Sequence, residues 1–222
     1  MELLICYLLQ FDDDPLTEAM VDSMPLARYA AEHWIDHAKS GGMDPTVLQL
    51  IMHLFISESA PFINWIRIYN IDKGEEDFSL NRSKVCCALY YASLAGMHEV
   101  SDCLLHKGEN ANAEGGSLGN PLQAAAYKGN EAIVKLLLEN GAVVDAEAGW
   151  YGNALQAASF GGNEAIVKVL LENGAGVNAE GGEYGNALQA ASFGGNEAIR
   201  LSMVWSRSRS SPGLDLDPST AV

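Results

Sequence analysis

Apolar residues recur along the second half of the chain with a fixed period. The segment Gly152–Ile166 returns as Gly185–Ile199 with the same residue at every position, a shift of 33 residues. A similar copy begins at Gly119, and a degenerate one covers Leu89–Gly96. In each complete copy an alanine-rich stretch precedes a strongly apolar one such as Glu131–Glu139. We therefore expect two helices per unit. The second helix is apolar around most of its circumference, so it must be covered on more than one side.

Helix start and stop signals bracket both expected helices. Asparagines stand at the N-cap position of the first helix, and glycines end it; a second set of asparagines stands at the start of the second helix. These residues are Asn120, Asn153 and Asn186, then Gly129, Gly162 and Gly195, then Asn130, Asn163 and Asn196. Asn140-Gly141 and Asn173-Gly174 end the second helix. The glycine-rich stretch after it, such as 175–185, predicts an extended hairpin, and several units must stack to bury their faces.

The leading part of the chain follows a different helical pattern. A helix begins near Pro25 and ends near Lys39, with one apolar stripe that includes Trp34. Asp44-Pro45 begins a second helix, and 62–69 is a third apolar segment. We therefore expect a small helical region over residues 1–80, docked on the repeats or continuing them.

Composition narrows the possible partners. Hydrophobic residues make up 48% of the chain and charged residues 19%, which is typical of a globular protein, and the formal charge is −16. This charge would repel nucleic acid and an anionic membrane, although it also serves simply to keep a chain soluble. No apolar run approaches the roughly 18 residues of a membrane span. The cysteines Cys6, Cys86, Cys87 and Cys103 show no disulfide spacing, which favours a reducing, cytoplasmic (intracellular) compartment.

Candidate chemistry in the sequence is weak. His33 and His37 have the i, i+4 spacing that can share a zinc ion, but no third ligand is evident and neighbouring aromatics favour packing. Cys103 and His106 have C-x-x-H spacing, yet the repeat places Cys103 at a core position. Neither a phosphate-binding loop nor a hydrolase motif occurs in the sequence. We expect no catalytic residue, no metal and no cofactor, and hence no enzyme.

The repeat resembles a known family. Asn120-Pro121-Leu122-Gln123-Ala124-Ala125 and Asn153-Ala154-Leu155-Gln156-Ala157-Ala158 are similar to the T-P-L-H-x-A signature of ankyrin repeats, with Asn for Thr and Gln for His. The resemblance implies an all-α ankyrin-repeat solenoid of helix–turn–helix and hairpin units. It covers residues 84–200, divided into 86–118, 119–151, 152–184 and a partial unit 185–200.

A second resemblance concerns the leading helices. Pro25–Ala38 and Phe62–Tyr69 are similar to the segments that precede ankyrin repeats in fungal NACHT-type, NLR-like receptors. In those proteins a nucleotide-switching domain is followed by a helical connector and by repeats that sense a ligand or partner. This sequence lacks the G-x-x-x-x-G-K-[ST] loop, so only the connector and the sensor end would be present.

The expected binding surface lies on the hairpin tips, which vary while the scaffold repeats. We expect it to comprise Ser117, Leu118, Trp150, Tyr151, Glu183 and Tyr184, with Tyr127 from a first helix. Tyr151 and Tyr184 could equally pack hairpin against hairpin, and Phe160 and Phe193 favour packing between repeats. The sequence therefore predicts a monomeric module that binds another protein. Two alternatives remain, an adaptor that recruits a target to a separate enzyme and a fragment without independent activity.

The last copy departs from the repeat after Ile199. Either Arg200 and Ser202 give a terminal repeat its polar outer face, or the sequence here leaves the true repeat frame. In both interpretations residues 206–222 are expected to be disordered.

Overall fold

The computed structural model describes residues 2–12, 16–41, 44–56 and 59–210, and the chain divides into two compact units, Met1–Ser117 and Leu118–Val222. Helices dominate the described residues of both units, with two short strands in the second. The predicted all-α architecture is therefore confirmed. None of the helices in these described ranges is both long and apolar enough to cross a lipid bilayer.

The first unit begins with the helices of the leading region and ends with the most degenerate repeat. Its elements are α1 (Glu2–Leu8), α2 (Glu18–Asp22), α3 (Ala27–Gly41), α4 (Pro45–Leu54), α5 (Ala60–Ile68), the 3-10 helix η1 (Arg82–Lys84), α6 (Ala88–Ala95) and α7 (His98–His106). The side chain of Asp44 accepts hydrogen bonds from the backbone of Thr46 at 2.8 Å and Val47 at 3.0 Å, so the predicted start of α4 is confirmed. The sequence pattern did not predict α2.

Aromatic side chains from three helices form the core of this unit. Trp34 of α3 contacts Trp65 of α5 and Phe55 after α4, with ring centroids 5.3 and 6.0 Å apart. All three side chains are buried, and the indole nitrogen of Trp65 donates to the carbonyl of Ala31 at 3.0 Å. Each such side chain removes a large apolar surface from water, so Trp34 lies on a core stripe, as the spacing predicted.

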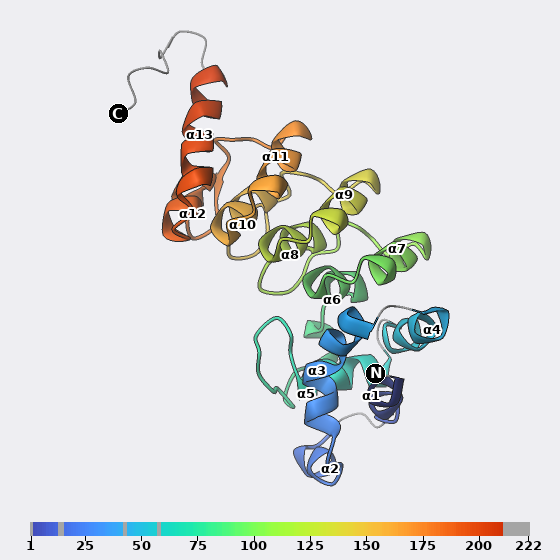
Figure 1. The fold of residues 1–222 in the computed structure, drawn as a ribbon. Helices are drawn as coiled ribbons and strands as arrows, with labels where there is room; N and C mark the ends of the chain where they lie inside the picture. Colours follow the sequence, from blue (N-terminus) through green and yellow to red (C-terminus); the bar gives the residue numbers. More distant parts are fainter. Residues whose placement is uncertain (1, 13–15, 42–43, 57–58, 211–222) are drawn as a thin grey trace. The chain divides into compact units, whose positions relative to one another are not determined.

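The second unit is a stack of paired helices. Its elements are α8 (Pro121–Lys128), α9 (Glu131–Glu139), α10 (Ala154–Gly161), α11 (Glu164–Glu172), β1 (Glu180–Gly181), β2 (Gly185–Asn186), α12 (Ala187–Phe193) and α13 (Glu197–Ser210). Figure 1 shows α8, α10 and α12 side by side in one row and α9, α11 and α13 in a second row. The first-row helices are rich in alanine, and these small buried side chains let neighbouring backbones approach closely.

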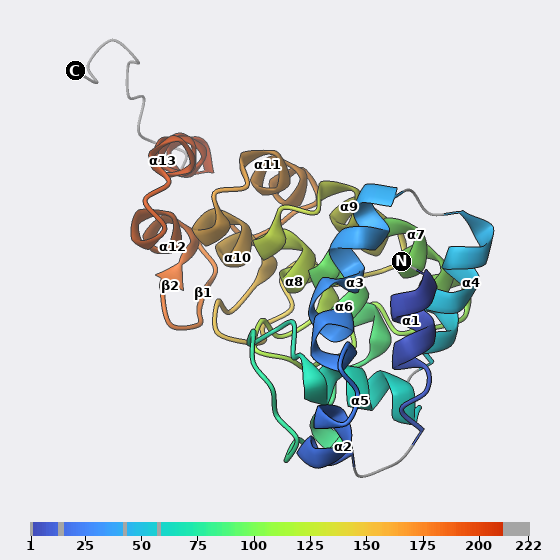
Figure 2. The same cartoon turned by 60° about the horizontal axis from the view of Figure 1, so that its bottom comes forward.

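The N-cap signals work as predicted at the first helices of the second unit, whereas α12 ends at Gly194, one residue before the predicted Gly195. The side-chain oxygen of Asn153 accepts from the backbone of Gln156 at 2.9 Å, and Asn120 and Asn186 make the equivalent bond. Gly162 ends α10 in the left-handed region with φ 78°. Glu180 then pairs with Asn186 across the antiparallel β1–β2 hairpin, which projects beside α12 in Figure 2.

The asparagines at the start of the second helices have a different role from the one predicted. Asn163 makes no cap bond to its own helix; its side-chain amide donates to the carbonyls of Ala126 and Tyr127 at 2.8 and 2.9 Å. Asn196 donates in the same way to Ser159 and Phe160. These residues satisfy the last carbonyls of the preceding repeat's first helix, so they join repeats rather than cap a helix.

The final helix is longer than its counterparts. The nine-residue helix α11 ends before Asn173-Gly174, whereas α13 has 14 residues and continues to Ser210. The helix thus includes residues 206–210 of the tail that we expected to be disordered, and the sequence after Ile199 has no Asn-Gly stop signal. Residues 211–222 lie outside the described part of the chain.

Candidate protein-binding site

Glutamine side chains fix the hairpins of the second unit. The buried Nε2 of Gln123 donates to the carbonyls of Ala146, Ala148 and Gly152 at 3.2, 3.0 and 2.9 Å. One repeat later, Gln156 donates to Ala179 at 3.1 Å and Gly185 at 3.3 Å. The glutamine that replaces histidine in the signature therefore holds the hairpin that follows its own pair of helices.

Glycines allow successive hairpins to lie in contact. Gly149 has φ +61°, and a Cβ there would lie 2.3 Å from the carbonyl carbon of Leu118. Gly182 is equivalent, with a Cβ position 2.4 Å from the carbonyl carbon of Tyr151. No other residue fits this conformation and this spacing together. The tips therefore stack in register, and the backbone of Glu183 donates to the carbonyl of Trp150 at 2.9 Å.

Stacked tips and first helices bring five aromatic rings into one row, which we term the aromatic ladder: Tyr127, Tyr151, Phe160, Tyr184 and Phe193. Tyr127 and Tyr151 stack with centroids 5.1 Å apart, and Tyr151 and Tyr184 stack at 5.6 Å with an interplanar angle of 16°. Phe160 contacts Tyr184 at 4.9 Å, and Phe193 lies 5.2 Å beyond Tyr184. The ladder alternates between hairpin tips and first helices, so it runs across repeat boundaries.

Exposure differs strongly along this surface. Tyr151 is only 8% exposed, whereas Trp150 beside it is 59% exposed and Phe193 at the end of the ladder is 72% exposed. Burial, together with hydrogen bonding to the Tyr127 side chain, raises the pKa of Tyr151 above its usual range. Tyr151 therefore acts mainly as packing between hairpins, and Trp150 offers the accessible aromatic surface on the tips.

The remaining expected contact residues are placed as follows. Leu118 is 7% exposed, so its side chain packs inside and offers little surface to a partner. Ser117 belongs to the first unit, where its hydroxyl donates to Asp72 at 2.6 Å. Glu183 is exposed, and Tyr184 is half-buried within the ladder. The sequence favoured packing between repeats for Phe160 and Phe193 over a part in the binding surface, and their recurrence 33 residues after Tyr127 and Phe160 indicated a shared row.

Comparison with known families decides the identity of the repeats. The family described as "Ankyrin repeats (3 copies)" matches residues 35–148 and 89–181. The chain belongs to the ankyrin-repeat family. Proteins built from ankyrin repeats are protein-interaction modules, and this chain is such a module. The match also extends ahead of the expected start of the ankyrin array at residue 84.

One curated relative is similar over part of the ankyrin array and its surroundings. It is the azaphilone pigments biosynthesis cluster protein L of Monascus ruber, 34% identical over an alignment 151 residues long that covers 60% of this chain. This chain spans about a third of that protein's length, since the aligned part is 32% of it. The relative's name does not mention a NACHT-type receptor.

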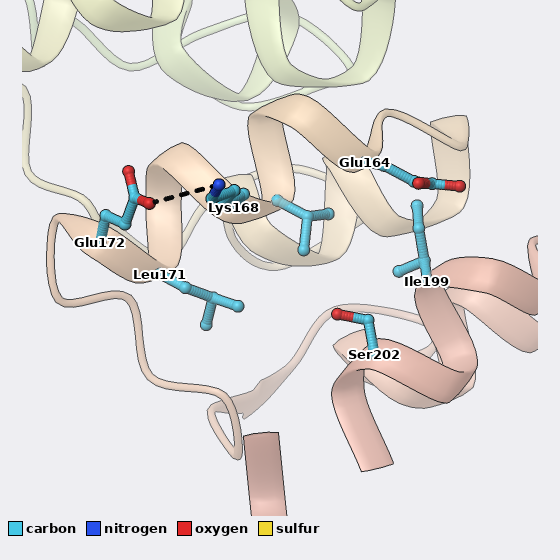
Figure 3. A pocket seen from close by; sticks show the side chains of 7 residues that line it. Glu164, Lys168, Leu171, Glu172, Ile199 and Ser202 are labelled. Atoms are coloured by element: carbon cyan, nitrogen blue, oxygen red, sulfur yellow. Dashed lines mark ion pairs between the residues drawn. The ribbon is translucent and has the colours of Figure 1, made fainter. Parts of the chain in front are cut away.

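A shallow groove lies between the last two second-row helices of the ankyrin array. It encloses about 530 Å³ and is lined by Glu164, Val167, Lys168, Leu171, Glu172, Ile199 and Ser202. In Figure 3, α11 contributes Glu164, Lys168, Leu171 and Glu172, and α13 contributes Ile199 and Ser202. Nζ of Lys168 lies 4.0 Å from Oε1 of Glu172, and the two side chains form an exposed i, i+4 ion pair. The polar groups do not converge on a point in the groove, so it lacks the arrangement of a catalytic site.

Other candidate groups lie in the first unit. The hydroxyl of Tyr29 lies 3.1 Å from Nε2 of His37, and its ring lies 4.6 Å from that of His33. In the described ranges, His, Cys, Asp and Glu side chains do not gather in threes as a metal site requires. Burial raises the pKa of the Cys86 thiol to about 11, so this cysteine is a poor nucleophile at neutral pH.

Proposed function

We propose that this chain binds another protein through the aromatic ladder and the exposed Trp150 beside it. The observation that carries the proposal is a row of aromatic rings that crosses three ankyrin repeats and ends in large exposed side chains. Tryptophan and tyrosine dominate the binding free energy of protein interfaces because they bury much area and lose little conformational entropy. Rings already fixed by stacking lose even less on binding.

The rigid support of the hairpins favours the same conclusion. Gln123 and Gln156 hold the tips through buried hydrogen bonds, and the backbone bond from Glu183 to Trp150 fixes one tip against the next. A surface whose backbone is fixed before binding can recognise a partner without first becoming ordered. Exposed carboxylates on the tips, Glu147, Glu180 and Glu183, would then select against acidic partners.

Site-specific photo-crosslinking tests the proposal. The photoreactive residue p-benzoylphenylalanine is placed at Trp150 in one variant and at Lys168 on α11 in another, and both are expressed in the native host. We expect a discrete crosslinked partner from position 150 that is absent from position 168. Adding Tyr184→Ala to the first variant should abolish the product while circular dichroism shows an intact fold. Equal products from both positions would mean that the ladder is not the binding surface.

The finer assignments rest on likeness alone. The resemblance of Pro25–Ala38 and Phe62–Tyr69 supports a role as the sensor end of a larger NLR-like receptor. The relative's name supports instead a setting in pigment biosynthesis, with the chain recruiting a target to a separate enzyme. The four free cysteines support a reducing, intracellular compartment. Sequencing of the full transcript distinguishes the receptor role from the role in pigment biosynthesis, because a receptor requires a phosphate-binding loop upstream of the repeats.

A further inference from the structure

Trp150 and Glu183 occupy the same position on successive hairpin tips, one period of the repeat apart. The backbone of Glu183 donates to the carbonyl of Trp150 at 2.9 Å, so the two tips lie in register. The rings of the residues that follow, Tyr151 and Tyr184, stack at 5.6 Å. This register places an exposed indole next to an exposed carboxylate on neighbouring tips. Because both side chains are exposed, neither is needed for packing within the array.

Negative charge on these hairpins is left without a balancing cation. The hairpin segments 141–153 and 174–186 contain no lysine, arginine or histidine. Their carboxylates belong to Asp145, Glu147, Glu180 and Glu183. Asp145 accepts from the backbone of Gly176 at 3.0 Å, whereas the three exposed glutamates form no ion pair with any described residue. On α9 and α11, by contrast, a lysine pairs with a glutamate one turn away. The tips therefore present carboxylates that are available to a bound cation.

The aromatic ladder already holds a cation at its first ring. The ammonium group of Lys128 lies 5.6 Å from the centroid of the Tyr127 ring, within the range of a cation–π contact. The positions equivalent to Lys128 in the next two repeats are Gly161 and Gly194. A Cβ at Gly161 would lie 2.5 Å from the carbonyl oxygen of Tyr127, and one at Gly194 would lie closer still to a carbonyl of α10. Close packing of the first helices thus leaves no room for an equivalent lysine, so a cation on the later rings must come from a bound segment.

Arginine is the side chain that fits the two tips. Its planar guanidinium group can stack on an aromatic face and at the same time donate two hydrogen bonds to a carboxylate. Trp150 offers the aromatic face and Glu183 the carboxylate, while Glu147 and Glu180 add negative charge along the same two hairpins. Lysine supplies the charge but lacks the planar group, so it fits less well. The surface therefore suits a segment that carries arginines.

We infer that the partner bound at the aromatic ladder supplies a basic segment, with an arginine held between Trp150 and Glu183 and a further cation over the exposed ring of Phe193. The inference rests on the proposed function and adds the chemical class of the partner. A second copy of this chain is an unsuitable partner, because it brings the same formal charge of −16. Residues 211–222 of this chain contain two aspartates and no lysine or arginine, so they lack the required chemistry.

Binding of labelled peptides to the full chain tests the inference. The probe is a short peptide in which arginine alternates with glycine, and matched peptides carry lysine or citrulline, a neutral analogue, in place of each arginine. Fluorescence anisotropy measures the dissociation constants at an ionic strength of about 0.15 M, which screens long-range attraction. We expect the arginine peptide to bind most tightly, the lysine peptide more weakly, and the citrulline peptide not measurably.

Matched variants locate the contact. The tip variant combines Glu147→Gln, Glu180→Gln and Glu183→Gln. The helix variant removes the same charge from exposed positions of α9 and α11 through Glu139→Gln, Glu164→Gln and Glu172→Gln. The tip variant should bind the arginine peptide about tenfold more weakly, and the helix variant about twofold more weakly at most. Trp150→Ala and Phe193→Ala should each weaken binding about fivefold, while circular dichroism shows an intact fold.

Several results would overturn the inference. Equal weakening by the tip and helix variants would mean that only the overall charge attracts the peptide, and equal binding of the citrulline peptide would mean that no cation is recognised. The double variant Arg207→Gln/Arg209→Gln should bind as the wild type does; tighter binding would show that the chain's own arginines occupy the surface instead of a partner.

The segment crosslinked at position 150 distinguishes this inference from the proposed function. Mass spectrometry of the crosslinked product should identify a segment rich in arginine or lysine. A discrete partner crosslinked through an acidic or neutral segment would overturn the inference and leave the proposed function standing. A chain that binds the arginine peptide at the tips, yet yields no crosslinked partner in its host, would refute the proposed function while supporting the chemistry inferred for the surface.

Discussion

The glutamine bridge between repeats allows a matched test of what fixes the binding surface. Gln123→Ala removes an amide whose two hydrogens are shared by three hairpin carbonyls, while Gln189→Ala removes the same side chain where it is exposed. The bonds that set the N-cap of each helix use the backbone of the glutamine, so both variants keep them. The pair therefore isolates the contact with the following hairpin.

The expected magnitude follows from the contacts. Two buried hydrogen bonds contribute about 1 kcal/mol each, and the lost methylene adds about 0.8 kcal/mol. The side-chain oxygen of Gln123 is buried without a partner, so its removal offsets about 1 kcal/mol. We expect Gln123→Ala to lower the free energy of unfolding by about 2 kcal/mol, and Gln189→Ala to change it by less than about 0.5 kcal/mol.

Urea denaturation followed by circular dichroism at 25 °C measures both values. Hydrogen exchange resolved by mass spectrometry should in addition show faster exchange in 145–152, the hairpin that carries Trp150, for Gln123→Ala alone. Equal losses of stability in the two variants would refute the reasoning, because the substituted side chains then contribute through their own helices. Unchanged exchange in the hairpin would refute the claim that the glutamine fixes the tip.

Three further predictions address other features. Gly149→Ala should lower the free energy of unfolding by about 2 kcal/mol or more, because its Cβ would meet the Leu118 carbonyl. Gly141→Ala, also at a positive φ but with open space around its Cβ, should lower it by about 1 kcal/mol in the same urea assay. Similar losses would contradict this close approach. The pKa of Tyr151 is higher in the folded than in the unfolded state. The contribution of Tyr151 to stability is therefore complete below the unfolded pKa of about 10 and declines as pH rises towards the folded pKa. Between pH 10 and 11, the free energy of unfolding of the wild type should therefore fall by up to about 1.4 kcal/mol more than that of Tyr151→Phe. Urea midpoints that fall in parallel for the two proteins would disprove this prediction. At pH 8, iodoacetamide should alkylate Cys86 about 100-fold more slowly than the exposed Cys6, as peptide mass spectrometry would report; comparable rates would show that Cys86 is not shielded by burial.

The period of the array could be read from the sequence because its signals are local. Asn153 and Gly162 act within a few residues of their own helix, so their positions fix its start and end. The start of α4 at Asp44 is local in the same sense. The five-residue helix α2 is too short to show an apolar period, which explains why the pattern did not predict it.

The exposure of the tip residues could not be read in the same way. Trp150 and Tyr151 are neighbours on one tip, yet Trp150 is 59% exposed and Tyr151 only 8%. The bond between Ser117 and Asp72 joins residues 45 positions apart, and no spacing rule relates them. Burial at a turn depends on which distant segment packs over it, so the contacts between the hairpin-tip rings and the helix rings became evident only from the geometry.

Two kinds of joint recur from α8 to α12: a glutamine that donates to the hairpin after its own pair of helices, and an asparagine that donates to the first helix of the preceding repeat. Successive copies share two equivalent acceptors for the glutamine and two for the asparagine. None of these bonds is specific to one pair of repeats. A gene encoding such an array can therefore gain or lose one whole unit by misaligned recombination between its near-identical copies, and each new junction forms the bonds of the old one. The array can change length over generations, and with it the reach of the surface that it offers, without any compensating substitution.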